Sequence, residues 1–312
     1  MAEVMKVYAN FHTHTTHSDG VYSPTEIVDV AVKEGYRALS ITDHDTYTGN
    51  AEARDACQRA GIDFIPGIEF STRSKAMRQW FHMTAFDFDP EYPEMKEYLR
   101  RCSATLADQT EQLFERGKKN GFISEKITWQ DVLDYNKSIT WLCNNHVFQT
   151  MKHMGIATDA DYPAFFENVF HHHRREIPKL YEFLPIEEII PLVKAAGGIT
   201  IVAHPYKQIH NIPKLLEYGI EGIEVWHSTL TDEEKREALK LALKHNLYIS
   251  GGSDHEGLCG GQYKYYEHPE EMHFWAEPCS LGTTKEFFDE IKNQKLMPNR
   301  EEYIMKYIEE YK

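Results

Sequence analysis

The chain is poor in the features that mark secreted and membrane proteins. Its 312 residues include 5 cysteines and no CxxC pair, so we expect reduced thiols and neither a disulfide framework nor a zinc knuckle. No apolar run approaches membrane-spanning length, and residues 1–6 lack the pattern of an export signal. These absences predict a cytoplasmic protein that does not bind membranes.

Positive charge is also scarce. The chain has 34 Lys and Arg against 49 Asp and Glu, a net charge of −15. Such a surface repels polyanions, which argues against a long nucleic acid as partner. It is compatible with a small phosphorylated substrate, because bound divalent cations reverse the potential inside one pocket. An apolar content of 41% predicts a folded chain with one large core or two domains.

Histidine, by contrast, is abundant, with 17 residues, and the first cluster lies near the N-terminus. His12 and His14 follow a short apolar run at residues 7–9. Side chains alternate along an extended chain, so both imidazoles leave the same face, where they can form half of a metal site. Asp19 lies in the expected loop, and Gly20 allows that loop to turn tightly.

Strand-like and helix-like segments alternate along two parts of the chain. We expect strands at residues 7–9, 38–42, 62–68 and 80–88, with helices between the first three, and the alternation resumes after residue 186. The last helix is expected at residues 285–292. This rhythm predicts parallel βα units, with polar residues at the C-terminal ends of the strands, where barrel active sites are built.

Residues 92–181 have a different character, because helical patterns follow one another without a convincing strand. We therefore expect a helical insertion over residues 92–181 and a barrel domain formed by residues 1–91 and 182–312. The insertion is either a cap over the strand ends or a solvated helical subdomain with no catalytic part.

The expected strand ends carry many imidazoles and carboxylates. They are His12, His14, Asp43, His44, Glu69, His82, His204, Glu224, His227, Asp254 and His255. Mixed His and carboxylate ligands without thiolate suit Zn, Mn or Fe(II). So many potential ligands exceed one tetrahedral set and indicate two or more ions.

Five motifs in this order resemble the signatures of the polymerase-and-histidinol-phosphatase (PHP) family of metal-dependent phosphoesterases. They are Phe11-His-Thr-His14 with Ser18-Asp-Gly20, Ile41-Thr-Asp-His-Asp45, Gly67-Ile-Glu69, Ala203-His-Pro205 and Gly252-Ser-Asp-His255. The resemblance implies an α/β fold, a distorted (β/α)7 TIM-like barrel with the helical insertion as a subdomain. It also implies a cofactor of three divalent metal ions (Mn, Zn or Fe).

The resemblance further implies which residues bind each ion. The first ion would take His12, His14, Glu69 and Asp254; the second would share Glu69 and add His82 and His204; the third would take Asp19, His44 and His255. Asp43 and Asp45 are expected to orient His44 through hydrogen bonds. His17 has no assigned role.

The implied activity is hydrolysis of a phosphate monoester of a small molecule, such as a nucleotide or nucleoside bisphosphate. Clustered dications neutralise the ester and lower the pKa of water, which supplies metal-activated hydroxide. Asp254 and His227 are the candidate catalytic residues. His227 is a candidate acid for the leaving group, although a packed strand-end histidine explains it equally well.

Relatives with an insertion at this place carry an Arg two residues before a His, and both serve the substrate phosphate. Here His146 is in place, but Asn144 stands where the Arg would be and cannot supply a charged fork. Arg174 and Arg175, in the segment that re-enters the barrel, are candidates for the missing charge. The alternative is a solvated basic run.

Other functions stay open at this level, because a fold does not fix a reaction. They are histidinol-phosphatase-like activity, metal-dependent hydrolysis of a C–N or C–O bond on the same barrel, and a non-catalytic metal-binding module. The sequence does not predict the oligomeric state.

Overall fold

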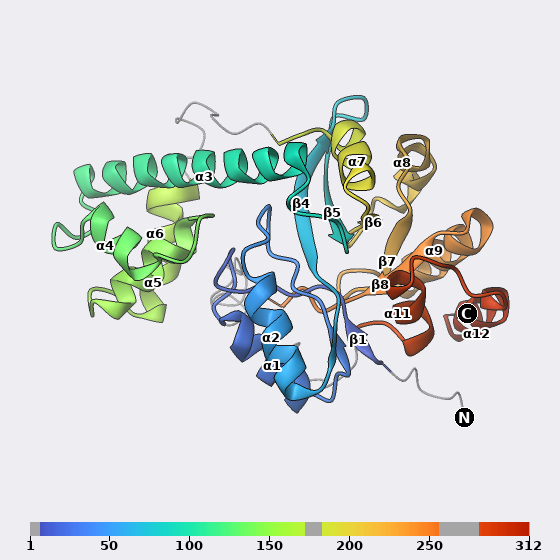
Figure 1. The fold of residues 1–312 in the computed structure, drawn as a ribbon. Helices are drawn as coiled ribbons and strands as arrows, with labels where there is room; N and C mark the ends of the chain where they lie inside the picture. The colour runs from blue at the N-terminus through green and yellow to red at the C-terminus, as the bar shows by residue number, and fades with distance from the viewer. Residues whose placement is uncertain (1–6, 172–182, 256–280, 312) are drawn as a thin grey trace.

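The computed structural model describes residues 7–171, 183–255 and 281–311, and these form a mixed α/β fold with helices around two sheets (Figure 1). Within these ranges, no helix combines the length and the apolar character that crossing a membrane requires.

The first sheet contains the predicted N-terminal βα units. Its three parallel strands are β1 (Ala9–Asn10), β2 (Ala38–Leu39) and β3 (Asp63–Phe64), in that order. Helix α1 (Pro24–Lys33) connects β1 to β2, and α2 (Asn50–Ala60) connects β2 to β3. α1 begins with a capping box, because Ser23 accepts from the backbone N–H of Glu26 while the Glu26 carboxylate accepts from the backbone N–H of Ser23.

The second sheet has five strands, and here the prediction of parallel strands throughout is wrong. In order they are β4 (Gly67–Ser74), β5 (Gln79–Phe86), β6 (Ile199–Val202), β7 (Gly222–Trp226) and β8 (Tyr248–Gly251). β6, β7 and β8 are parallel, but β5 is antiparallel to both β4 and β6. The link between β4 and β5 is too short for a crossover helix, so the two strands form a hairpin.

This hairpin changes the position of two candidate ligands. The expected strand 62–68 is split into β3 and the start of β4, so Glu69 lies inside β4 rather than at a C-terminal end. His82 likewise lies inside β5 rather than at the strand end, where the sequence predicted it.

The two sheets meet at both edges of the five-stranded sheet. His44, which follows β2, forms an isolated bridge with Glu69 on β4. Thr13, which follows β1, forms another with His255, beyond the end of β8. Segments from distant parts of the sequence therefore converge at this place.

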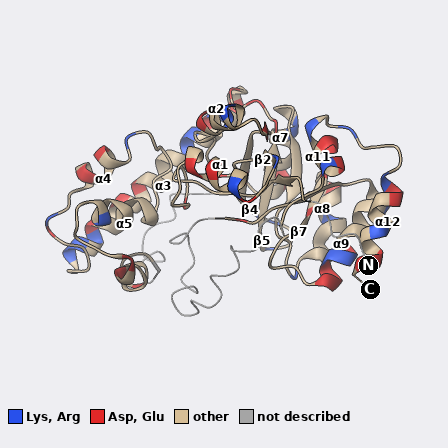
Figure 2. Ribbon diagram, turned by 90° about the horizontal axis from the view of Figure 1, so that it is seen from below, with Lys and Arg blue, Asp and Glu red and all other residues tan. Residues whose placement is uncertain are grey.

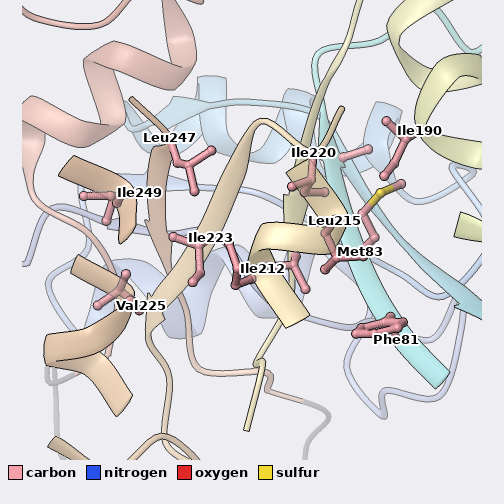
Figure 3. Packing of buried hydrophobic residues seen from close by; sticks show 14 of the residues in the cluster. Phe81, Met83, Ile190, Ile212, Leu215, Ile220, Ile223, Val225, Leu247 and Ile249 are labelled. Carbon is pink, nitrogen blue, oxygen red and sulfur yellow. The ribbon is translucent and has the colours of Figure 1, made fainter. Parts of the chain in front are cut away.

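Helices cover the outer side of the second sheet. They are α7 (Ile186–Ala195), the short 3-10 helix η3 (Ile209–Asn211), α8 (Ile212–Tyr218) and α9 (Asp232–His245). Their apolar faces pack on the strands, as Figure 3 shows for Ile190 and Leu215 beside Met83 and for Ile212 beside Ile223. Burial of such a side chain contributes about 1.5–3 kcal/mol relative to leaving it exposed.

Two helices end the described chain, and the prediction that α11 (Lys285–Lys292) is the last is wrong. A further helix, α12 (Arg300–Glu310), follows and buries Ile304, Tyr307 and Ile308. The sequence does carry a start signal that the prediction overlooked, because Asn299 stands at the N-cap and Glu301 and Glu302 follow in the first turn.

Residues 93–171 are mainly helical, which is the character that the sequence predicts for them. The elements are α3 (Pro93–Lys119), α4 (Trp129–Tyr135), α5 (Asn144–His153), η1 (Asp159–Asp161), α6 (Tyr162–Phe165) and η2 (Phe166–His171). α3 runs outward from the sheets, and the shorter helices pack beneath its far end around a separate apolar cluster (Figure 1). Acidic and basic residues are interspersed along these and the other outer helices (Figure 2).

Candidate metal centre

The N-terminal histidines lie where the end of β1 meets the segment after β8. The Asp254 N–H donates to the carbonyl of His12 at 2.9 Å. Gly252 permits this approach, because a Cβ at residue 252 would lie 2.3 Å from the Cβ of His12. Gly20 serves the next turn, where a Cβ would lie 2.7 Å from the carbonyl of His14.

The four residues predicted for the first ion converge. The Nε2 of His12 lies 3.2 Å from Oε2 of Glu69 and 3.4 Å from Oδ1 of Asp254. The Nε2 of His14 lies 3.3 Å and 3.0 Å from the same two atoms. One donor atom from each of the four residues lies within 4.8 Å of the others, close enough to bind one ion together.

The second oxygen of Glu69 faces the residues predicted for the second ion. Its Oε1 lies 2.9 Å from Nε2 of His204 and 3.1 Å from Nδ1 of His82. The two imidazole nitrogens are 3.2 Å apart. The two oxygens of Glu69 therefore face different sets of histidines, since Oε2 lies near His12 and His14 and also 3.2 Å from Nδ1 of His44.

The third group differs from the predicted set in one member. The Nε2 of His44 and Nδ1 of His14 each lie 3.6 Å from a carboxylate oxygen of Asp19. The backbone carbonyl of His255 accepts the backbone N–H of His14 at 2.9 Å, and the His255 ring faces Tyr22. Among the described residues, the potential ligands around Asp19 are thus His14 and His44, and not His255.

The buried polar atoms of the centre fit a metal cluster. Nε2 of His12, Nε2 of His14, Nδ1 of His44 and Oε2 of Glu69 are all buried and make no hydrogen bond within the described residues. Buried polar atoms are nearly always hydrogen-bonded, and an ion is one of the few explanations for exceptions. A nitrogen and oxygen donor set without thiolate suits Zn, Mn or Fe(II).

The pKa values of His12 and Glu69 are both shifted by the opposite charges packed around them. Burial would lower the pKa of His12, but the negative charges of Glu69, Glu224 and Asp254 outweigh it and hold that pKa well above the usual range. Burial would raise the pKa of Glu69, but His12 and neighbouring imidazoles hold it well below the usual range. The site therefore favours the ionised form of Glu69, the form that binds a cation.

Glu224 is a functional candidate to which the sequence assigned no role. It lies on β7, 1% exposed, and its carboxylate oxygens lie 3.1 and 3.2 Å from Nδ1 of His12. It also accepts the His204 N–H at 2.7 Å, which holds His204 in a left-handed backbone conformation with φ of 26°. The signal in the sequence was its position on an expected strand among the other candidate ligands.

Asp43 has a different partner from the one predicted. It accepts from the N–H and hydroxyl of Thr15 and from the hydroxyl of Ser18, each at 2.7 Å, so it holds the loop after β1 rather than the ring of His44. His17 is buried in the same loop, with Nδ1 2.7 Å from the hydroxyl of Thr48.

The candidate acid His227 is buried beside the centre. Its Nδ1 accepts the Thr229 N–H at 3.2 Å, so a neutral ring carries its proton on Nε2. Nε2 lies 3.5 Å from Oδ2 of Asp254 and makes no hydrogen bond within the described residues. This geometry leaves a proton facing the cluster.

The candidate substrate-binding residues are only partly described. Both ring nitrogens of His146 bond to the protein: Nδ1 accepts the Cys143 N–H and Nε2 donates to the Thr16 carbonyl, each at 2.9 Å. Asn144 donates to Asn145 and Tyr162 within the insertion. Arg174 and Arg175 lie outside the described residues.

Comparison with known proteins agrees with the motifs. Residues 10–188 match the PHP domain family. The 5'-3' exoribonuclease of Haemophilus influenzae is 28% identical over 258 residues, which are 80% of this chain and 90% of that protein. The 3',5'-nucleoside bisphosphate phosphatase of Chromobacterium violaceum is 27% identical over 255 residues, 78% and 86% of the two chains.

A crystal structure of a Bifidobacterium adolescentis protein assigned as a metal-dependent phosphoesterase is also similar. It has a TM-score of 0.72 and 25% sequence identity, and the alignment covers 96% of this chain and 99% of that one. Since the domain match spans more than half of the chain and relatives align along most of its length, the protein belongs to the PHP family of metal-dependent phosphoesterases.

Proposed function

We propose that the protein hydrolyses a phosphate monoester of a small molecule on a cluster of three divalent ions, Mn, Zn or Fe. The observation that carries this proposal is the position of Glu69: its buried Oε2 faces His12, His14 and His44, and its Oε1 faces His82 and His204. A carboxylate that bridges two ligand groups in this way is suited to holding adjacent cations.

Bound dications supply positive charge for an anionic ester and lower the pKa of nearby water. The chain's own residues account for the remaining requirements. His12, His14 and Asp254 provide a fixed set of donors on one side of Glu69, and His82 and His204 provide one on the other. His227 holds a proton at Nε2 toward the cluster, where it is placed to protonate a leaving oxygen.

The substrate class follows from charge and from the relatives' names. A net charge of −15 disfavours a long polyanion, so a small ester is the better substrate. The similar proteins are named for a nucleoside bisphosphate and for RNA, so nucleotide-derived phosphates are the first to test. The exoribonuclease name makes a short 5'-phosphorylated RNA the second candidate.

The experiment is a substrate panel with Mn²⁺, comprising p-nitrophenyl phosphate, a nucleoside 3',5'-bisphosphate, histidinol phosphate, a 5'-phosphorylated RNA oligonucleotide, and an amide and a carboxylic ester. We expect phosphate release from the small monoesters and none from the amide or ester. Faster cleavage of the RNA would replace this proposal by exonuclease activity, and cleavage of the amide alone would end it.

Two variants connect turnover to the cluster. His44→Ala and Asp254→Ala are each expected to lower the bound metal and to abolish turnover, because each removes one potential ligand. His210→Ala is the matched control, since this histidine lies exposed in η3. Normal activity in either ligand variant would contradict the site assignment.

We further propose that the two sheets are parts of one distorted (β/α)7 barrel, formed by residues 1–91 and 182–312, with residues 92–181 as the inserted subdomain. The bridges His44–Glu69 and Thr13–His255 support closure at both edges of the larger sheet. The separate apolar cluster of the insertion supports its independence. A crystal structure with an open gap at either bridge would contradict the barrel.

A further inference from the structure

The start of helix α5 lies against the loop that carries Asp19. Asn145 donates from Nδ2 to the Asp19 carbonyl at 2.6 Å, and His146 donates from Nε2 to the Thr16 carbonyl at 2.9 Å. The Cys143 thiol lies 3.6 Å from the Ser18 carbonyl, as a weak donor. Within four residues, the insertion therefore contacts three carbonyls of one metal-site loop.

These donors are themselves held in place. The Nδ1 of His146 accepts the Cys143 N–H, which ties the ring to the first turn of α5. The Oδ1 of Asn145 accepts the hydroxyl of Tyr162 at 2.6 Å and the Nδ2 of Asn144 at 3.0 Å. The contact with the loop is thus made by side chains fixed inside the insertion.

The insertion also contacts the other side of the same site. The Trp141 ring stacks on His44 with centroids 6.2 Å apart and planes 26° apart, and Trp141 is 9% exposed. Asp19 and His44, which face each other at 3.6 Å, are both contacted by residues 141–146. Among the described residues, Glu69 and His12 pair with other side chains of the strands and strand ends, His44 included.

We propose that the helical insertion completes the metal site formed by His14, Asp19 and His44, with Asn145, His146 and Trp141 as its positioning residues. His146 then acts on the metal-site loop rather than on the substrate phosphate. The inference rests on the proposed function in that this site holds a divalent ion. According to this proposal, binding of an ion by His14, Asp19 and His44 depends on the contact between α5 and the loop. Binding of ions at the sites around Glu69 does not.

A matched pair of substitutions at His146 separates its two hydrogen bonds. His146→Asn keeps an acceptor near the position of Nδ1 for the Cys143 N–H but does not reach the Thr16 carbonyl. His146→Gln places a donor near the position of Nε2 and loses the bond to Cys143. We expect His146→Asn to weaken binding of one ion by about 10–100-fold, as loss of residues that orient ligands does, and His146→Gln to restore much of it.

The readouts are metal content per chain after desalting, measured by inductively coupled plasma mass spectrometry, and Mn²⁺ titration by calorimetry. Asn145→Ala and Trp141→Ala are expected to lose one ion per chain, like His146→Asn. Thr128→Ala is the control, because it removes the capping box of α4 inside the insertion and leaves the loop contacts intact. Far-UV circular dichroism checks that each variant is folded.

The outcomes separate the two proposals. A folded wild-type protein that binds no divalent ion would overturn the proposed function. A second result is that the wild type binds every ion while His146→Asn, Asn145→Ala and Trp141→Ala keep the same metal content and Mn²⁺ affinity. That result would overturn only the role of the insertion. Equal loss of every ion in those variants, or loss of one ion in Thr128→Ala, would also overturn it, because the effect would then not be specific to this site.

Discussion

Glu224 joins ligands that belong to different groups of the metal centre. One carboxylate contacts the Nδ1 of His12 and accepts the backbone N–H of His204, which come from separate segments of the sequence. The contact to Nδ1 leaves the Nε2 of His12 directed at Glu69. Such partners fix the tautomer and the orientation of metal-binding histidines.

The substitution Glu224→Gln tests whether the metal centre needs both the contact with His12 and the hydrogen bond from the His204 N–H. An amide can accept from His12 or from the His204 N–H, but its NH₂ group then faces the other donor. We expect Mn²⁺ affinity and kcat/KM for p-nitrophenyl phosphate to fall by about 10–100-fold. Calorimetry and steady-state kinetics measure the two effects.

The control for Glu224→Gln is Glu217→Gln, which removes an exposed carboxylate paired with Lys214 and should change neither quantity. Wild-type metal affinity in Glu224→Gln would show that the carboxylate does not orient His12. A loss of stability without any loss of metal affinity would assign Glu224 to packing alone.

Among the elements, α12 is joined to the fold through one buried ion pair. Arg300, at the start of α12, donates to both carboxylate oxygens of Glu290 on α11, at 3.0 and 3.3 Å. It also donates to the carbonyls of Ala242 and Leu247, at 3.2 and 2.6 Å. Both charged residues are buried, so Arg300 connects α12 to α11, to α9 and to the residue before β8 without access to water.

Breaking this pair should be costly, because the remaining charge stays buried without a partner. We expect Arg300→Ala to lower the free energy of unfolding by about 3–5 kcal/mol. Chemical denaturation followed by circular dichroism measures the change. In the double variant Arg300→Met/Glu290→Leu, which removes both charges, much of the loss should be recovered. A loss below about 1 kcal/mol in Arg300→Ala would mean that the pair behaves like an exposed one.

The β4–β5 hairpin is the element that decides the geometry of the centre. Antiparallel pairing places Ser71 opposite His82 and Glu69 opposite Thr84, so Glu69 and His82 approach from neighbouring strands. The sequence predicted a strand for residues 80–88 but not its direction. Local propensity indicates an extended chain, and only pairing with a neighbour gives it an orientation.

For the whole molecule, the metal ions should act as part of the folded structure. A cation that binds only the native state stabilises it by about 2.7 kcal/mol at a hundredfold excess over Kd. We expect chelation with EDTA to lower Tm by several degrees and Mn²⁺ to restore it. Thermal unfolding of the chelated and the reloaded protein measures the shift.

In Asp254→Ala the Mn²⁺-dependent rise in Tm should be smaller, because one ligand of the first group is missing. His210→Ala should behave like the wild type. An equal rise in wild type and Asp254→Ala would mean that Mn²⁺ stabilises the protein at another place.

Much of the local structure could be predicted from the sequence alone. The capping boxes at Ser23 and Thr231 give the starts of α1 and α9, and Gly61 ends α2 in a left-handed conformation. α11 occupies the residues expected for it, 285–292. These signals act between residues a few positions apart, so the sequence carries them without reference to the fold.

The sequence by itself determined which side chains were available as ligands and the family whose motifs they form. Only the tertiary structure decided how they meet: Glu224 reaches His12 across 212 positions of the chain, and Asn145 reaches Asp19 across 126. Contacts of this range depend on how strands pair and helices pack. Periodicity and capping act over a few residues, so they do not encode such contacts.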